Sequence, residues 1–265
     1  MRWWGEAMLG AITGDIIGSV YEFDNKKPEF EFPLFRSESE FTDDTVLTVA
    51  LADCILSGVE YKIKLLEYVR LYPYCGYGLR FQMWASKSNS EPYNSWGNGS
   101  AMRVSPVGWA YNDLETVLQK AKESAEVTHN HPEGIKGAQA TAASIFLART
   151  KQTKKEIKAF IEKNFQYNLN FDLEDLRKNY EFNESCQDTV PQAIFTFLVS
   201  DSFEDSIRKA IYIGGDSDTL ACINGSIAEA FYGGVPENIK SEVYKRMDSR
   251  ITIITNDFRE AKKIP

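Results

Sequence analysis

The sequence predicts an all-α protein, and two observations support this prediction. Apolar residues recur at helical spacing along most of the chain, whereas the strict alternation typical of a half-buried strand is missing. Several apolar runs also follow aspartate, serine or threonine, the residues preferred at helix N-caps. With 265 residues the chain can bury one full core, so we expect residues 1–265 to form a single domain, although this length also allows two small ones.

The first expected helix runs from Ala7 to Tyr21 and carries Gly10, Gly14 and Gly18 at four-residue spacing. This spacing places the three glycines on one face of the helix. An interior glycine costs a helix about 1 kcal/mol, so three of them need a packing reason. The stripe therefore predicts a buried helix that another backbone approaches closely.

Glu22 follows this helix and stands between Tyr21 and Phe23. The negative end of the helix dipole and partial burial against aromatic rings both disfavour a carboxylate at this place. Glu22 is therefore either a functional carboxylate or an exposed residue at the entrance to the loop expected over 24–40.

A second helix is expected over 46–56, ended by Gly58. Thr42, Asp43 and Asp44 crowd the start of this helix, where capping residues are common.

The stretch 72–109 is rich in Gly, Ser, Asn, Pro and aromatic residues, and its composition predicts a loop. It is long for a simple connector. Backbone N–H groups, short polar side chains and an aromatic face in such a loop suit a phosphate and a flat ring. The residues that offer these groups are Ser95, Trp96, Asn98 and Gly99, and Arg103 could add positive charge or cap a helix.

Helices are next expected over 114–127 and 134–149, with His129 and His131 between them. Two histidines without a nearby cysteine or third histidine argue against a zinc site and favour a hydrogen-bond donor to a substrate. The Lys-rich stretch 150–183 keeps helical apolar spacing, so we expect a surface helix and loop rather than a disordered linker.

The remaining helices are expected over 186–198, 203–213, 220–232 and 236–263. Gly214 and Gly215 allow a sharp turn before 220–232, and Asp216, Asp218 and Thr219 follow at the start of that helix. An N-cap explains one carboxylate there but does not need two. The spacing of oxygen-bearing residues does not match a calcium-binding EF-hand, and the Lys-Ser/Thr end of a phosphate-binding P-loop is absent.

The two acidic helix starts resemble each other. If the fold brings them together they form an all-oxygen shell, and neighbouring carboxylates tolerate each other poorly without a cation. Hard oxygen ligands favour Mg²⁺, Mn²⁺ or Ca²⁺ over zinc. The number of carboxylates indicates two ions, whereas separate helix caps remain the alternative.

Composition limits the class of protein. The chain has 43% hydrophobic and 26% charged residues, as ordinary globular proteins do. A net charge of −8 argues against a general nucleic-acid surface, so an anionic ligand needs local positive charge. The four cysteines show no C-x-x-C spacing and are expected to be reduced thiols. Without a clear signal peptide or a membrane-spanning run, we expect a soluble, cytoplasmic protein.

Five motifs, taken in order, resemble those of the ADP-ribosylglycohydrolase family, which includes the ADP-ribosylhydrolases. They are Gly14-Asp15 with Tyr21-Glu22, Thr42-Asp43-Asp44-Thr45, Gly97-Asn98-Gly99 with Met102-Arg103, Thr128-His129, and Gly214-Gly215-Asp216-Ser217-Asp218-Thr219. The resemblance covers nearly the whole chain. It implies an orthogonal bundle of helices with a dinuclear magnesium or manganese centre, which cleaves the bond between C1″ of ADP-ribose and an acceptor.

The resemblance also implies roles for single residues. The metal ligands would be Thr42, Asp43, Asp44, Asp216, Asp218 and Thr219. The residues that contact ADP-ribose would be Ser95, Trp96, Asn98, Gly99 and His129. Glu22 is the expected acid or base, and Asp43 and Asp216 complete the expected catalytic set. Asp15, Arg103 and His131 receive no role.

Two other functions share these features. One is an inactive ADP-ribose-binding or structural protein with the same fold, and the other is a Mg²⁺-dependent nucleotide phosphohydrolase. The complete set of oxygen ligands and Glu22 favour the glycohydrolase. No motif identifies the acceptor, so arginine, serine, a nucleic-acid base and a small ADP-ribose ester all stay open, with an ADP-ribosylated protein as a candidate partner.

Overall fold

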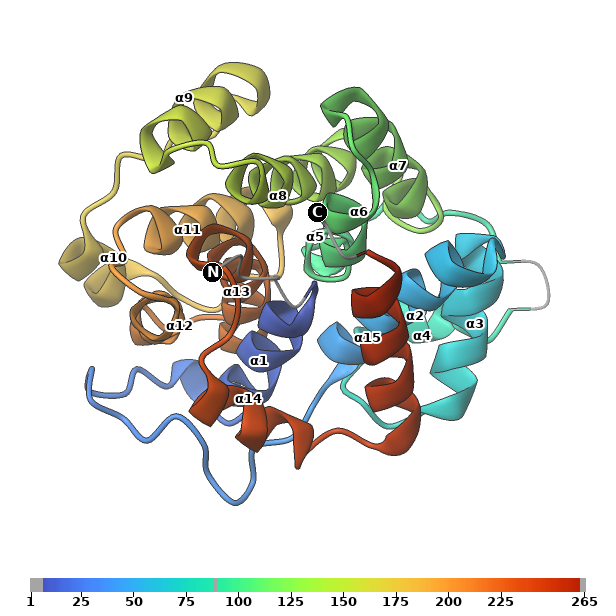
Figure 1. Ribbon diagram of the computed structural model, residues 1–265, viewed down its shortest axis with the longest axis horizontal. Coiled ribbons are helices and arrows are strands. Elements are labelled where there is room, and N and C mark those ends of the chain that lie inside the picture. The colour runs from blue at the N-terminus through green and yellow to red at the C-terminus, as the bar shows by residue number, and fades with distance from the viewer. Residues whose placement is uncertain (1–6, 88–89, 263–265) are drawn as a thin grey trace.

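The computed structural model describes residues 7–87 and 90–262, and it confirms the all-α prediction (Figure 1). Within these residues the structure has no β-strand and only an isolated antiparallel bridge between Gly97 and Ser185. The helices are α1 (Leu9–Gly18), α2 (Asp43–Ser57), α3 (Tyr61–Leu71), α4 (Leu79–Ala85), α5 (Gly99–Met102), α6 (Ser105–Ala110), α7 (Leu114–Glu126), α8 (Pro132–Arg149), α9 (Lys154–Phe165), α10 (Leu173–Asn179), α11 (Cys186–Leu198), α12 (Phe203–Tyr212), α13 (Ser217–Tyr232), α14 (Glu237–Tyr244) and α15 (Ser249–Ala261), with a short 3-10 helix at Phe23–Asn25.

The centre of the fold is the pair of helices α1 and α13, and their contact explains the glycine stripe. Both helices are buried along almost their whole length. A Cβ built on Gly14 would lie only 1.9 Å from the carbonyl oxygen of Ala221, and Cβ atoms on Gly10 and Gly18 would also meet the backbone of α13. The expected close backbone approach is therefore confirmed. It brings the start of α13 beside the C-terminal half of α1, where Asp15 lies.

We expect Gly14→Ala to destabilise the protein strongly. The added methyl group would overlap a backbone carbonyl that cannot move without separating α1 from α13, so the cost should reach about 3 kcal/mol or more. Gly78→Ala is the matched control, because a Cβ at Gly78 meets no atom within 4 Å. Urea denaturation measures both variants. Equal stability of the two would contradict the packing described for α1 and α13.

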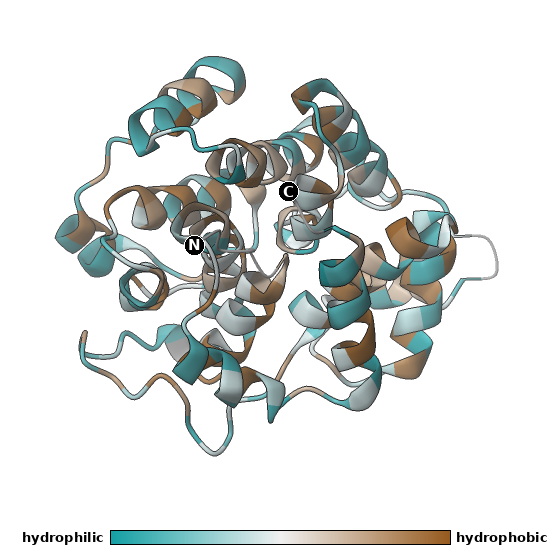
Figure 2. Ribbon diagram, in the orientation of Figure 1, coloured by the Kyte–Doolittle hydropathy of each residue, from teal (hydrophilic) through white to brown (hydrophobic). Residues whose placement is uncertain are grey.

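The other helices surround this pair. Helices α8, α11 and α12 pack against α13, and α2 packs against α1, α3 and α15. In Figure 2 the peripheral helices α9 and α10 are largely hydrophilic, with apolar residues on part of their surface. No helix in the described part of the chain is both long enough and apolar enough to span a bilayer.

The structure differs from the elements expected over 72–109 and 236–263, and of these residues 88–89 and Lys263 lie outside the described part of the chain. The stretch 72–109 contains α4, α5 and α6 and is not one loop, and 236–263 breaks between α14 and α15. The three missed helices have only four to seven residues, and tertiary packing rather than propensity decides whether such short segments are helical. The break after α14 coincides with Asp248, whose side chain accepts a hydrogen bond from the N–H of Ile251 and caps α15.

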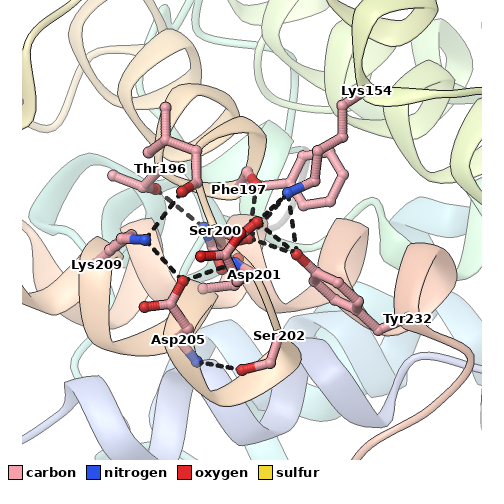
Figure 3. A network of polar contacts seen from close by, with 12 residues as sticks. Lys154, Thr196, Phe197, Ser200, Asp201, Ser202, Asp205, Lys209 and Tyr232 are labelled. Carbon is pink, nitrogen blue, oxygen red and sulfur yellow. Dashed lines mark hydrogen bonds and ion pairs between the residues drawn. The ribbon is translucent and has the colours of Figure 1, made fainter.

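The Lys-rich stretch 150–183 contains two helices, α9 and α10, where one surface helix and a loop were expected. Lys154 anchors the beginning of this stretch (Figure 3). The Lys154 ammonium donates to the backbone carbonyl of Ser200 and lies 3.0 Å from the Tyr232 hydroxyl. It also lies 5.1 Å from the centre of the Phe197 ring. Partial burial among these rings lowers the pKa of Lys154 to about 8. This network connects the start of α9 with the C-terminal ends of α11 and α13. The acidic residues of α13 lie at the other end of that helix.

Candidate active site

The fold brings the two acidic helix starts together, and Asp15 of α1 links them to the core. One Asp15 carboxylate oxygen accepts hydrogen bonds from the backbone N–H groups of Thr42 (2.9 Å) and Thr45 (3.0 Å). The other accepts from the Thr42 hydroxyl at 2.6 Å. A carboxylate favours the positive end of a helix dipole, so Asp15 fixes the start of α2. Sequence patterns had indicated no role for this residue.

The start of α13 has the predicted turn geometry. Gly214 and Gly215 have φ angles of 77° and 84°, in the left-handed region that favours glycine. The Gly215 N–H donates to the side-chain oxygen of Asn25 at 2.7 Å. Asp216 then accepts a hydrogen bond of 2.6 Å from the side-chain amide of Asn98. This bond joins the acidic cluster to the predicted binding loop.

A direct contact connects α13 with α2. The Thr219 hydroxyl donates to Asp44 at 3.2 Å, so residues 175 positions apart in sequence are neighbours. The structure therefore brings the two predicted groups of ligands into one place, and the alternative of two unrelated helix caps does not describe this geometry.

The carboxylates form two groups of three that share Asp218. One group is Asp15, Asp44 and Asp218, and the other is Glu22, Asp216 and Asp218. In each group the ligand oxygens lie within 4.8 Å of one another. Asp43 belongs to neither group, although its charge acts on the same cluster and its side chain lines the cavity described below.

Burial and mutual repulsion disfavour the charged form of these groups. Desolvation, followed by the charge of Asp218, raises the pKa of Asp43 and Asp44 well above the usual range. Desolvation is also the main reason why the pKa rises to about 6 for Asp216 and to about 8 for Glu22. No lysine or arginine pairs with the cluster among the described residues. The carboxylates therefore lack a protein counter-charge.

The donor set fits a hard divalent cation. Both groups consist of carboxylates alone, and no histidine or cysteine belongs to either. One oxygen of Asp44, Oδ1, is buried without a hydrogen-bond partner in the protein, which is costly unless another ligand takes that position. The arrangement supports the prediction of Mg²⁺ or Mn²⁺ over zinc.

The pKa shifts predict how stability depends on pH in EDTA. The folded chain binds protons to these carboxyl groups more tightly than the unfolded chain, so the free energy of unfolding should fall as pH rises from about 4 to about 8. Each proton held only by the folded chain contributes about 1.4 kcal/mol per pH unit. Urea denaturation at pH 5, 6, 7 and 8 measures this slope. Stability that rises over this interval would contradict the account.

A cavity of about 280 Å³ opens above the cluster, close to the lower end of the range for small-molecule sites. Glu22 and the carboxylates form one part of its wall, and Tyr93, Ser95 and residues 97–99 with His129 form another. The predicted residues that line it are Glu22, Asp43, Asp44, Ser95, Asn98, Gly99, His129, Asp216, Asp218 and Thr219.

Two predicted residues do not line the cavity. Thr42 lies beneath the cluster and donates to Asp15. Trp96 is 47% exposed, and its ring packs against the edge of His131 at 5.6 Å between ring centres. His131 itself caps α8, because its Nδ1 accepts from the N–H of Glu133.

The cavity also contains residues that sequence reasoning missed. Arg80 of α4 donates to the Tyr93 carbonyl at 2.7 Å, and its guanidinium lies over the Tyr93 ring at 5.1 Å. Glu184 lies just before α11, and its backbone carbonyl accepts a hydrogen bond of 2.7 Å from the N–H of Asn98. An arginine in a segment otherwise read as loop and a glutamate before α11 match no motif, so only the fold identifies them as cavity residues.

Known proteins resemble this chain in sequence and in fold. The chain is 26% identical to the ADP-ribosylhydrolase ARH3 of Gallus gallus over 85% of this chain and 84% of that protein. It is 25% identical to the ADP-ribosylarginine hydrolase Tri1 of Pseudomonas putida, over 87% and 71% of the two chains. A solved structure of an ADP-ribosylglycohydrolase-related protein complex has the same fold, with a TM-score of 0.73 at 23% identity over 97% of this chain and 96% of that one. Because the family model for ADP-ribosylglycohydrolases matches residues 5–263, the chain belongs to the ADP-ribosylglycohydrolase family.

Proposed function

We propose that this protein is a metal-dependent hydrolase that removes ADP-ribose from an acceptor by cleaving the bond at C1″. The observation that carries the proposal is the pair of carboxylate groups that share Asp218 at one side of a ligand-sized cavity. Family membership and the names of the relatives support the same reaction. In this proposal residues 1–265 form one ADP-ribosylglycohydrolase domain.

The proposed metal ligands are Thr42, Asp43, Asp44, Asp216, Asp218 and Thr219, and the geometry adds Asp15 as a candidate. Two divalent cations, Mg²⁺ or Mn²⁺, would orient the ribose hydroxyls and lower the pKa of a bound water. A shared carboxylate between two groups of ligands suits a two-ion centre. The buried side chains around them fix the positions of the oxygens before the ligand arrives.

Glu22 is the proposed acid or base. It is half-buried at the cavity wall, and burial with the neighbouring charge of Asp218 raises its pKa to about 8. A carboxyl group in this environment can hold a proton near neutral pH, which protonation of a leaving group requires. Asp216, held by Asn98, would keep its oxygens directed at the reacting ribose. Asp43 completes the acidic wall.

The other wall would bind the rest of ADP-ribose. We propose that Ser95, Asn98, Gly99 and His129 contact the ligand from the cavity wall and that Trp96 contributes from its rim. Arg80 is the exposed arginine of this wall, and together with the buried Arg103 it supplies local positive charge for a diphosphate. An ADP-ribosylated protein is the proposed macromolecular partner.

The test measures release of ADP-ribose from arginine-linked, serine-linked and DNA-linked substrates, with Mg²⁺, with Mn²⁺ and with EDTA. The proposal predicts release that needs a divalent ion, and the preferred substrate identifies the linkage. Inorganic phosphate is measured in the same reactions with free nucleotides. Phosphate release without ADP-ribose release would replace the proposal with a phosphohydrolase, and metal-dependent ADP-ribose binding without release would indicate a binding protein.

A further inference from the structure

A buried line of three side chains runs from Arg103 through Thr128 to His129, and its two end residues, Arg103 and His129, line the cavity. The Arg103 guanidinium donates from Nη2 to the Thr128 hydroxyl oxygen at 2.8 Å and to the carbonyl of Ser124 at 3.0 Å. The Thr128 oxygen in turn lies 2.6 Å from Nδ1 of His129. Arg103 and Thr128 are completely buried, and His129 is 4% exposed.

Arg103 is an expensive residue at this place. Its Nε and Nη1 atoms are buried without a hydrogen-bond partner in the protein, and no carboxylate of the described residues pairs with it. A buried cation with unsatisfied donors costs stability. The hydrogen bonds that Arg103 does make go to the segment that carries His129, so this arginine joins that segment to the wall of the cavity.

The hydrogen bonds determine the direction of the line. Arginine only donates, so the Thr128 oxygen accepts from Arg103 and its own proton must go elsewhere. The other partner of this oxygen is Nδ1 of His129. The described residues offer the Thr128 proton no other acceptor, so donation to Nδ1 is the arrangement that uses this proton, and in it Nδ1 carries none.

The remaining proton of the ring is then on the cavity side. Burial, followed by the charges of Arg103 and Arg80, lowers the pKa of His129 well below its usual value, so the ring is neutral and has one N–H. That N–H is at Nε2. Cβ atoms built on Gly97 and Gly99 would lie 3.5 and 3.3 Å from Nε2, and His129 lines the cavity. No protein acceptor among the described residues bonds to Nε2.

We propose that Arg103 and Thr128 are positioning residues that fix the Nε2–H tautomer of His129, so that the ring donates a hydrogen bond to an oxygen of the bound ligand. This inference rests on the proposed function for the identity of the ligand, ADP-ribose. The glycines at 97 and 99 leave the space beside Nε2 that a ligand oxygen needs. With the other tautomer, Nε2 would present a lone pair to the ligand and repel an anionic oxygen.

The first test observes the tautomer directly. The chain has two histidines, so His131→Asn leaves His129 as the only ring, and asparagine can still cap α8. Long-range ¹H–¹⁵N correlation spectra of ¹⁵N-histidine protein identify the protonated nitrogen. We expect only Nε2–H between pH 6 and 8. Thr128→Val should allow both tautomers, and Thr128→Ser should restore one. A proton on Nδ1 of His129 in the His131→Asn protein that keeps Thr128 would overturn the inference.

The second test measures ADP-ribose binding by calorimetry in the same proteins. Loss of one well-placed hydrogen bond to a charged group should weaken binding about tenfold or more in Thr128→Val, and Thr128→Ser should bind as the parent does. Arg103→Lys should also weaken ADP-ribose binding. Thermal melting of this variant shows whether it is folded. If the parent protein shows only Nε2–H but Thr128→Val binds ADP-ribose with unchanged affinity, the positioning role is overturned. Failure of the parent protein to bind ADP-ribose would instead refute the proposed function and leave the tautomer result standing.

Discussion

Replacing Asp218 by asparagine is expected to lower kcat/KM by about 10²–10³-fold, the loss typical of removing one preorganised electrostatic contact. Asp218 is the carboxylate shared by both groups of ligands, so its loss affects both. The same change should raise the melting temperature of the protein in EDTA. Burial, followed by the charge of Asp216, disfavours the ionised form of Asp218 and raises its pKa well above the usual range, and asparagine removes this charge at nearly constant volume.

Asp53→Asn is the matched control for the effect on stability. Asp53 is also buried, but it accepts from the Lys64 ammonium at 3.0 Å and from the Tyr68 hydroxyl at 2.9 Å. Its replacement should lower the melting temperature, because it removes the more buried of the two carboxylates that pair with Lys64 and weakens the hydrogen bond with Tyr68. A lower melting temperature for Asp218→Asn in EDTA would show that the acidic cluster is not strained by like charge.

Replacing Glu22 by glutamine is expected to lower kcat by about 10²–10⁴-fold, the contribution of a positioned general acid or base. Glutamine keeps the shape of the side chain but cannot give up or accept the proton. Affinity for ADP-ribose should change little, because Glu22 acts at the reacting end of the ligand. Single-turnover kinetics and calorimetry separate these two effects.

Glu40→Gln serves as the control for Glu22, since Glu40 is an exposed carboxylate near the same acidic cluster that does not line the cavity. Its kcat should equal that of the unaltered protein. A Glu22→Gln protein that retains kcat within a few-fold would remove Glu22 from the proposed chemistry, and the acid or base would have to be sought among the aspartates of the cluster.

The features predicted successfully are those that local chemistry specifies. Aspartate and threonine at the starts of α2 and α13 are readable because such residues are preferred at helix starts, although only Thr42 of α2, and not Asp216 of α13, makes a side-chain cap bond. The glycine stripe of α1 is readable because three costly residues on one face need a packing partner. That these elements meet could be argued only from the number of unpaired carboxylates and from the family resemblance.

The features that were missed depend on contacts between distant residues. Asp15 caps α2 across 27 positions of sequence, and no local pattern encodes that bond. Arg80 reaches the cavity from α4, a seven-residue helix in a stretch whose composition predicts a loop. Trp96 looked like a cavity residue because aromatic rings suit nucleotides, yet the backbone turns its ring toward His131.

The most direct measurement of the central claim is anomalous diffraction from crystals grown with Mn²⁺ and ADP-ribose. The account predicts two manganese peaks, one beside Asp15, Asp44 and Asp218 and the other beside Glu22, Asp216 and Asp218, with the ribose C1″ end of the ligand toward Glu22. One peak, no peak, or ADP-ribose bound away from this cluster would contradict it.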